Sequence, residues 1–436
     1  MRSWLVSLRV YGDPRIIAIF CMGFSSGLPL LLVFGTLSFW LREAGVSRTA
    51  IGLFVLVGVS YSFKFLWSPI IDRLSLPFLT ARFGRRRGWA LAIQVPLMAA
   101  IFTLGSNDPA ARLGVTAALA VIVAFLSASQ DIVIDAYRIE LLKPDEQGAG
   151  AAATQWGYRL GTLAGSTGAF DAAAFGGWHF AYTIMAGLMF VGIASVLMTR
   201  EPTVPPIALP ARHAGEWRER ALDWVREAVV APFADFMRRR GWIAILCFIV
   251  LYKLGEAMAG SMSSPLYQEL GFSKTDVGNI GKLVGVVATL SGVASGGIAV
   301  ARLGLIRALF FAGVLQMLAN LLYVALLSAG NSDAMLALSI FGENFTGGMA
   351  SAAFVAYLSS LCNLAFTATQ YALFSSLAAV PARFLSAPSG WLVDHIGWAS
   401  FFVAATLICV PGLLVLLWMG RRYGVTPPFG TPASPR

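Results

Sequence analysis

The sequence predicts an all-helical membrane protein with twelve transmembrane helices arranged as two six-helix bundles. Three observations indicate this class. Hydrophobic residues make up 57% of the 436-residue chain and charged residues only 12%, about half of what a soluble domain carries. Twelve apolar runs are long enough to cross a bilayer as helices, and none alternates like the strands of a membrane barrel. One long hydrophilic segment, 200–241, divides these runs six and six.

The expected spans follow one another through short connections, apart from segment 200–241. A helix needs roughly 20 apolar residues to cross the hydrocarbon core, and each run meets that length within a few residues. We expect an N-terminal six-helix bundle over 1–199, a cytoplasmic linker over 200–241, and a C-terminal six-helix bundle with a short cytoplasmic tail over 242–436. The twelve expected spans are 16–40, 50–71, 88–106, 113–139, 149–170, 175–199, 242–267, 276–300, 305–329, 334–361, 366–389 and 397–419.

The linker opens with prolines and then mixes Trp217, Trp224 and Phe233 with charged residues. This pattern is typical of an amphipathic helix that lies along the membrane surface. A helix that binds a partner protein has the same features, so this alternative stays open. We expect the surface-lying helix.

Lysine and arginine are distributed unequally between the two sides of the expected membrane. Of the 32 basic residues, 23 fall on the side that holds both termini and segment 200–241, and 4 fall in the opposite loops. Because cytoplasmic loops carry the excess of positive charge, we expect both termini in the cytoplasm. The net charge of +10 therefore indicates topology, and we expect no nucleic-acid partner. The apolar stretch after Arg15 is too long for a cleavable signal.

Residue patterns for enzymes and metal sites are missing from the sequence. The cysteines lie in apolar runs without CxxC spacing, and the histidines are far apart, so we expect no metal site. We find no Ser/His/Asp order and no phosphate-binding loop, and we expect no enzymatic activity. The residues concerned are Cys21, Cys247, Cys362, Cys409, His179, His213 and His395.

The fourth expected span carries the densest group of polar residues inside the membrane. Gln130, Asp131, Asp135 and Arg138 recur every three to four residues, so they share one face of a helix. Asp135 and Arg138 have the spacing of a structural ion pair near the cytoplasmic interface. Asp131 lies a turn deeper, where an ionisable group is costly and therefore indicates function.

The second span offers Asp131 a partner, Lys64. Lys64 precedes Asp72 at the cytoplasmic end of its span by eight residues, and Asp131 precedes Arg138 by seven. At about 1.5 Å per residue, both lie roughly 10–12 Å above the inner boundary. A proton-coupled carrier uses a carboxylate in such a place, since burial and a nearby cation adjust its proton affinity. We expect Asp131, with Lys64, Asp135 and Glu343, to form the proton-coupling set.

Other polar residues inside the spans are candidates for binding a substrate. Arg159, near the middle of the fifth span, is expected to hold an anionic group. Lys253 and Glu256 either pair with each other at i,i+3 or contact the substrate. Glu343 and Asn344 lie in the tenth span, where a gating or proton-entry role for Glu343 competes with a structural one. With Gln130, the substrate-binding candidates are therefore Arg159, Asn344, Lys253 and Glu256.

The connection between the second and third spans carries a recognisable motif. Asp72 and Arg73 end one helix, and Arg85 and Arg86 begin the next. This connection resembles the loop between the second and third helices of the major facilitator superfamily, stretched by an insertion, and the six-plus-six layout resembles the same fold. The resemblance implies that these four residues gate the cytoplasmic side. The matching stretch of the second half, 295–304, lacks the aspartate.

Stretches over nearly the whole chain resemble the AmpG family of bacterial inner-membrane muropeptide permeases. The resemblance implies proton symport of N-acetylglucosaminyl-1,6-anhydro-N-acetylmuramyl sugars, with or without peptide. Such import serves peptidoglycan recycling and, in many Gram-negative bacteria, β-lactamase induction. The two most specific stretches are SQDIVIDAY (129–137) and ENFTGGM (343–349).

The family motifs match this chain residue by residue, with two departures. Gln130, Asp131 and Asp135 match the fourth-helix motif, and Glu343 and Asn344 match the tenth-helix motif. The departures lie near the inner face, where Gln147 replaces an arginine and Tyr137 replaces a tryptophan. They affect the gating detail more than the substrate class.

Two alternatives to a muropeptide permease stay open. One is a major facilitator carrier for another bulky anion, such as acetyl-coenzyme A or a sugar–peptide conjugate. The other is a membrane sensor or scaffold without transport, in which the linker docks a partner. We expect a monomeric carrier in the bacterial inner membrane that uses protons as the coupling ion and has no other cofactor.

Overall fold

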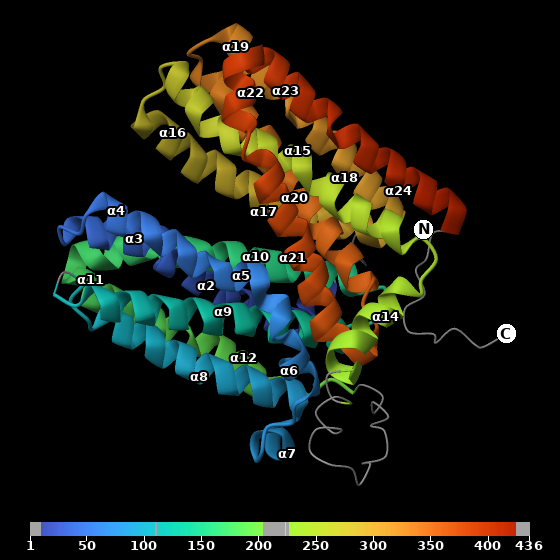
Figure 1. Cartoon of the computed structure of the whole chain (residues 1–436). Coiled ribbons are helices and arrows are strands. Elements are labelled where there is room, and N and C mark those ends of the chain that lie inside the picture. The colour runs from blue at the N-terminus through green and yellow to red at the C-terminus, as the bar shows by residue number, and fades with distance from the viewer. Residues whose placement is uncertain (1–9, 110, 204–222, 224–225, 424–436) are drawn as a thin grey trace. The chain divides into compact units, whose positions relative to one another are not determined.

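The computed structural model describes residues 10–109, 111–203, 223 and 226–423. Every element assigned within these residues is a helix, in agreement with the predicted fold class (Figure 1). The chain divides into two compact units. Unit 1 comprises Met1–Ala234 with Cys362–Ser376, and unit 2 comprises Asp235–Leu361 with Leu377–Arg436. The expected division into bundles over 1–199 and 242–436 stays a prediction.

Unit 1 contains the elements drawn from blue to green in Figure 1, together with η7 and the start of α21. Short 3₁₀ or π segments, labelled η, connect or interrupt its α-helices. These elements are η1 (Val10–Gly12), α2 (Pro14–Val33), α3 (Gly35–Glu43), α4 (Arg48–Leu53), η2 (Phe54–Gly58), α5 (Val59–Phe63), η3 (Lys64–Leu66), α6 (Ser68–Arg73), α7 (Leu79–Phe83), α8 (Arg85–Gly105), α9 (Leu113–Leu141), α10 (Gln147–Leu163), η4 (Ala164–Gly168), α11 (Ala169–Leu188), α12 (Phe190–Met198), η5 (Arg226–Val230), α14 (Ala231–Met237, which continues into unit 2), η7 (Leu364–Phe366) and α21 (Thr367–Ser386).

Unit 2 contains the remaining long helices and the second part of α21. Capping is visible at two of its helix starts, where the hydroxyls of Ser273 and Ser332 accept backbone N–H groups. Its elements are α15 (Trp242–Glu269), α16 (Lys274–Ile280), η6 (Gly281–Gly285), α17 (Val286–Leu303), α18 (Leu305–Ala319), α19 (Leu321–Ala329), α20 (Asp333–Ser360), α22 (Ser389–Ile396), α23 (Trp398–Leu407) and α24 (Cys409–Tyr423).

Eight stretches of the described residues are long and apolar enough to span a membrane, and a bent pair, Asp333–Ser360 with Leu364–Ile396, adds a ninth. One of the eight, Gln147–Met198, has 52 residues. At 1.5 Å per residue this is roughly 78 Å, more than twice the hydrocarbon thickness. Gly177, with φ 79°, interrupts its helical geometry. This stretch therefore covers two expected spans, 149–170 and 175–199.

The expected span 50–71 is not one continuous helix in the structure. Its residues form α4, η2, α5, η3 and α6 in succession. Gly52 and Gly58 weaken a helix because they lose more backbone freedom than other residues, and Pro69 fits only the first turn of a new one. As a consequence Lys64 lies in a 3₁₀ turn, where the rise per residue is larger than the 1.5 Å used to estimate its depth.

Half of the predicted linker, 204–222 and 224–225, lies outside the described residues. Trp217 and Trp224, on which the amphipathic helix was argued, lie outside them. Phe233 is described, and it lies in α14.

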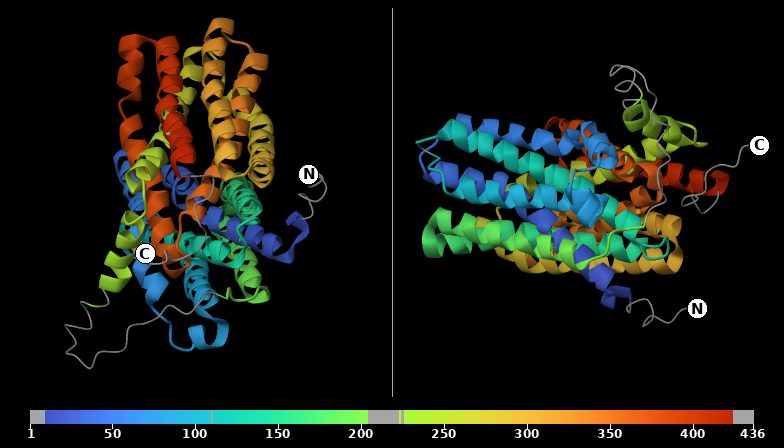
Figure 2. Two further views of the ribbon diagram at one scale, coloured as in Figure 1. Left: turned by 90° about the vertical axis from the view of Figure 1, so that its right-hand side faces the viewer. Right: turned by 90° about the horizontal axis from the view of Figure 1, so that it is seen from below.

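Two seams of direct backbone contact hold the units together internally. In unit 1, methyl groups built on Gly157, Gly161 and Gly165 would collide with carbonyl oxygens of α2, so α10 and η4 pack on α2 without a layer of side chains. In unit 2, Gly292 and Gly348 bring α17 and α20 equally close. The views of Figure 2 show α2 and α10 lying side by side. Such small-residue packing stabilises helix pairs in membranes, where lipid provides no hydrophobic driving force.

Candidate functional site

The helix α9 contributes to two apolar clusters of unit 1, one that includes Leu97 and Val123 and one that includes Ile93 and Val133. On the same helix, the carboxylate of Asp131 accepts a hydrogen bond of 2.5 Å from the hydroxyl of Ser26 on α2. This contact joins α9 to the α2–α10 seam.

Asp135 and Arg138 form the ion pair that their spacing allows. Arg138 Nη2 lies 3.5 Å from Asp135 Oδ1, and the Arg138 side chain is buried. The guanidinium carbon of Arg138 also lies 5.5 Å from the ring centre of Tyr371, at the start of α21. An aromatic face stabilises a cation in such an arrangement.

Lys64 lies near both carboxylates but contacts neither directly. Its side chain is buried, with 9% of its surface exposed, and its charge interacts electrostatically with Asp131 and Asp135. Within the described residues, no nitrogen–oxygen contact below 4.0 Å joins Lys64 to either group. The structure therefore brings the three residues into one electrostatic site, and the counter-ion role of Lys64 stays a prediction.

Gln130 has no hydrogen bond to this group in the part of the chain that the structure describes. Its side chain is fully buried, and both of its amide atoms lack a hydrogen-bond partner among the described residues. An unsatisfied amide in a buried place is costly and indicates a bound water or another polar group. Gln130 exposes no surface to a substrate in this structure.

Arg159 is exposed on α10, on the side away from α2. Gly157 and Gly161, two residues to either side, face α2 at backbone distance. Because residues two apart lie on nearly opposite faces of a helix, the glycine contacts direct Arg159 away from the seam. The side chain is free to meet a ligand that approaches this face of unit 1.

In unit 2, Lys253 and Glu256 form a pair within α15. Lys253 Nζ donates to Glu256 Oε2 over 2.6 Å, and both side chains are partly exposed. Glu256 also lines a small cavity with Gln316 of α18 and Cys409 of α24. The spacing predicted this pair, and its carboxylate keeps access to open space.

Glu343 and Asn344, neighbours on α20, are held by different elements. The Tyr323 hydroxyl of α19 donates a hydrogen bond to the Glu343 carboxylate. Asn344 donates to the Ile340 carbonyl over 2.8 Å and accepts from the Thr289 hydroxyl of α17 over 3.1 Å. Asn344 therefore satisfies its amide within unit 2.

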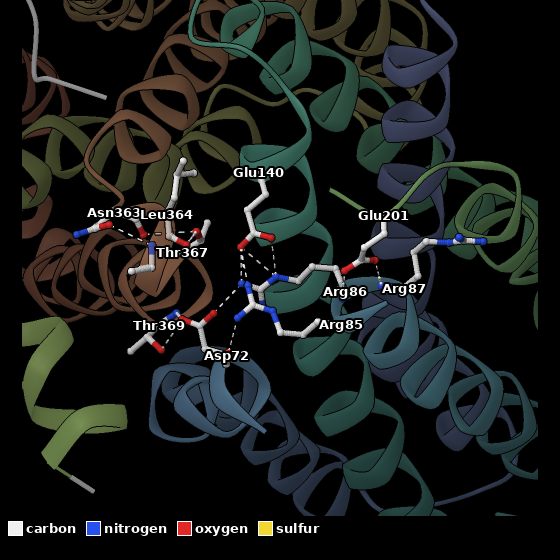
Figure 3. Close-up of polar contacts among 11 residues, drawn as sticks. Asp72, Arg85, Arg86, Arg87, Glu140, Glu201, Asn363, Leu364, Thr367 and Thr369 are labelled. Carbon is white, nitrogen blue, oxygen red and sulfur yellow. Dashed lines mark hydrogen bonds and ion pairs between the residues drawn. The ribbon is translucent and has the colours of Figure 1, made fainter. Parts of the chain in front are cut away.

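The motif between the second and third spans builds a buried ion cluster, which we call the Arg86 cluster (Figure 3). Arg86 Nη2 lies 2.6 Å from Asp72 Oδ1 and 2.5 Å from Glu140 Oε1, and at most 1% of each side chain is exposed. Arg85 donates to the Asp72 carbonyl over 2.9 Å. Asp72 Oδ2 also accepts from the backbone and hydroxyl of Thr369, over 3.2 and 3.1 Å. The cluster ties α6, α8, α9 and the start of α21 together.

Glu201 stabilises the start of α8 from the other side. Its carboxylate accepts the backbone N–H groups of Arg86 and Arg87, over 2.7 and 3.0 Å. A carboxylate at a helix N-terminus satisfies free donors and interacts favourably with the helix dipole. Figure 3 shows Glu201 and Glu140 approaching Arg86 from different elements.

Three members of this arrangement were not among the expected gating residues: Glu140, Glu201 and Thr369. Glu140 could have been predicted, because it lies at the end of the polar run that contains Asp131 and Asp135. A buried arginine also needs acidic partners, and Glu140 is an acid at the same end of the helices. Glu201 and Thr369 reach the cluster only through the tertiary fold, so no local sequence pattern predicts their contacts. Arg73, an expected gating residue, lies apart from the cluster: it stacks 4.9 Å from the ring centre of Phe366.

Comparisons with known proteins identify the class that this fold and these sites define. The model of the Major Facilitator Superfamily matches residues 16–387. Among solved structures, the proton:xylose symporter XylE superposes with a TM-score of 0.63 at 15% identity, covering 94% of each chain. The human organic anion transporter MFSD10 superposes with a TM-score of 0.60 at 17% identity, covering 94% of this chain and 99% of its own. These two likenesses concern the fold, which this superfamily builds from twelve membrane helices.

Curated relatives narrow the class. The anhydromuropeptide permease of Escherichia coli strain K12 is 42% identical over 412 residues, which cover 94% of this chain and 80% of the relative. A transporter designated AmpG 4, from Rickettsia felis, is 32% identical over 96% of this chain and 99% of its own length. The chain belongs to the major facilitator superfamily and, within it, to the AmpG permeases. It is a multi-pass membrane protein.

Proposed function

We propose that this protein is a permease that imports anhydro-muropeptides across the bacterial inner membrane. The observation that carries the proposal is the 42% identity, over 94% of the chain, to a relative that is named an anhydromuropeptide permease. The membrane-embedded charges support it, because a substrate with carboxylates needs a cation that it can reach. The protein carries out no chemical conversion in this proposal, and it acts as a monomer with both termini in the cytoplasm.

Arg159 is the residue proposed to bind the substrate carboxylate. Muropeptides carry the lactyl carboxylate or the carboxylates of their peptide, and a guanidinium binds such a group through two parallel hydrogen bonds. Three features support this role: Arg159 is exposed, the seam turns it away from α2, and its span is rich in glycine. In unit 2, the partly exposed pair of Lys253 and Glu256 offers a second polar surface for sugar hydroxyls.

Protons are the proposed coupling ions, and Asp131 is the proposed carrier of the proton. Its carboxylate has one neutral donor, Ser26, and a cation nearby, Lys64. Protonation of Asp131 would end its attraction to Lys64 and so change the balance of charge beside Asp135. That change is the kind of local event that biases one arrangement of a carrier over another.

The Arg86 cluster is proposed to stabilise the cytoplasmic ends of its helices in one state of the transport cycle. Arg86 forms buried ion pairs with both Asp72 and Glu140, and Arg85 lies 3.5 Å from Glu140, so separating these groups would leave buried charges without their closest partners. A state change that opens this side must offer these groups water or new partners. Asp72, Arg85 and Arg86 therefore belong to the proposed gate, together with Glu140.

Uptake by proteoliposomes tests the proposal. Purified protein is reconstituted, an inward proton gradient is imposed, and accumulation of a radiolabelled anhydro-muropeptide is measured against liposomes with a collapsed gradient. We expect accumulation above the external concentration only with the gradient. Unlabelled acetyl-coenzyme A serves as competitor: inhibition by it and not by unlabelled muropeptide would indicate the carrier of another bulky anion. Absence of any uptake by folded protein would favour a sensor or scaffold.

A further inference from the structure

The insertion between α6 and α8 carries a residue with two unfavourable features. Phe78, just before α7, has φ 62°, in the left-handed region. This conformation is unfavourable for an L-residue, and glycine would avoid the cost. The Phe78 side chain is also 90% exposed. A strained backbone that presents an uncovered aromatic ring indicates that the ring has a contact outside the protein.

The insertion is held firmly against α8. The Trp89 indole donates to the Leu74 carbonyl over 2.8 Å, and the Thr80 hydroxyl accepts the Leu76 N–H over 2.9 Å. A methyl group built on Gly88 would lie only 3.1 Å from the Leu79 carbonyl carbon, so α7 packs closely on the first turn of α8. The position of Phe78 is therefore set by the fold and is not that of a loose loop.

These contacts also give the depth of α7 relative to the membrane. Gly88 and Trp89 lie three and four residues into α8, about 4.5–6 Å from its start. Because α7 packs beside them, it lies level with the first turn of a membrane span. Tryptophan at this place in a span is typical of the headgroup region.

The charge of the insertion fits the same environment. Arg82 is the basic residue of α7 and is exposed, and no acidic residue occurs in the sequence between Asp72 and Asp108. By contrast, Arg86 and Arg87 use their side chains within the protein. An exposed arginine beside an exposed aromatic, at headgroup depth, matches a phospholipid surface, with its phosphates outside and its acyl chains inside.

We propose that α7 with its preceding turn is an interfacial anchor, in which Phe78 enters the headgroup–acyl boundary and Arg82 binds a lipid phosphate. The occupant is phospholipid, since the depth of α7 leaves the Phe78 ring at the bilayer surface. The anchor fixes the end of α8 that carries Arg86, so it would hold one side of the Arg86 cluster to the membrane.

Site-specific photocrosslinking of the full-length protein tests this inference. Benzoylphenylalanine replaces Phe78, and the protein is irradiated in vesicles of phosphatidylethanolamine and phosphatidylglycerol; lipid adducts are then measured by mass spectrometry. The same residue at Phe102, exposed within the α8 span, gives the lipid reference, and at Asp108, exposed in the loop after α8, the water reference.

We expect the lipid adduct at position 78 to approach that at Phe102 and to exceed that at Asp108 at least fivefold. Arg82→Gln in the same protein should reduce the adduct at least twofold, because the ring then loses its neighbouring phosphate contact. An adduct no greater than that at Asp108 would overturn the inference. Crosslinking to another part of this chain, or to a second protein, would equally overturn it.

Discussion

The two units hold their membrane-embedded carboxylates in different ways. In unit 1, Asp131 accepts a hydroxyl from Ser26 and interacts with the charge of Lys64. In unit 2, Glu343 accepts a hydroxyl from Tyr323, and its other electrostatic neighbour is a second acid, Glu256. A negative charge on Asp131 therefore meets a cation, Lys64, as well as a second acid, Asp135, whereas the charged neighbour of Glu343 is the acid Glu256.

The units also differ in how they stabilise their arginines and lysines. Unit 1 buries Arg86 completely and surrounds it with acids from two other elements. Unit 2 keeps its Lys253–Glu256 pair within one helix and partly exposed. Unit 1 thus contains an ion cluster whose members come from distant segments, beside local pairs such as Asp135 with Arg138, whereas the Lys253–Glu256 pair of unit 2 is local.

The largest difference in transport between the two units should appear when each carboxylate is replaced by its amide. We expect Asp131→Asn to abolish gradient-driven accumulation of labelled muropeptide, because the amide cannot carry the coupling proton. Glu343→Gln should keep accumulation within about twofold, since its amide oxygen still accepts the Tyr323 hydroxyl. Uptake by proteoliposomes with matched protein amounts measures both. The opposite outcome would move the coupling site to unit 2, and accumulation by both variants would make Asp135 the next candidate.

Removing one cation from each unit should have unequal effects on stability. Arg86→Met removes the closest cation from two buried acids, Asp72 and Glu140, and leaves only the more distant Arg85 beside Glu140, so we expect a cost of about 3–5 kcal/mol of unfolding free energy. Lys253→Met should cost about 1 kcal/mol or less, because water screens the exposed Glu256. Denaturant unfolding in detergent measures the two values. Arg82→Met, on exposed α7, is the matched control and should stay within about 0.5 kcal/mol of the original protein.

A change from arginine to lysine at position 159 should weaken substrate binding without removing the charge. Lysine loses the planar, two-point contact with a carboxylate, and we expect KM to rise about tenfold with little change in maximal rate, equivalent to about 1.4 kcal/mol. Arg112→Lys, in an exposed loop, provides the control. An unchanged KM in the Arg159 variant would remove this residue from the substrate site.

Removing the hydroxyl that donates to each carboxylate should have the smallest effect among these substitutions. Tyr323→Phe and Ser26→Ala each delete one hydrogen-bond donor, at a cost of about 1 kcal/mol in stability. Their effects on transport should differ: Ser26→Ala should shift the pH dependence of uptake, and Tyr323→Phe should leave it unchanged. A shift only in the Tyr323 variant would contradict the contrast drawn between the units.

Sequence reasoning predicted the helical class and the local pairs well. Hydropathy and the count of apolar runs were sufficient for the fold, and helical spacing was sufficient for Asp135 with Arg138 and for Lys253 with Glu256. These are features that a helix determines within one or two turns. The family assignment rested on stretches through nearly the whole chain, of which 129–137 and 343–349 are the most specific, and it is confirmed by the relatives.

Sequence reasoning was weaker where the backbone leaves a regular path or where distant elements meet. The span 50–71 was expected as one helix, because hydropathy reports composition and not the breaks that glycine and proline cause. Glu140 and Thr369 join Asp72 from segments far along the chain. Their contacts depend on tertiary packing, and no local periodicity predicts them.

The seam between α2 and α10 has a mechanical consequence. Where two helices are in backbone contact through glycines, no side chains lie between them that could change rotamer when one helix shifts. We therefore expect α2 and α10 to move together as one rigid body. Ser26, on α2, donates a hydrogen bond to Asp131, and Arg159 lies on α10. We therefore expect a displacement of α2 at Ser26 to move α10, and with it Arg159, by a similar amount.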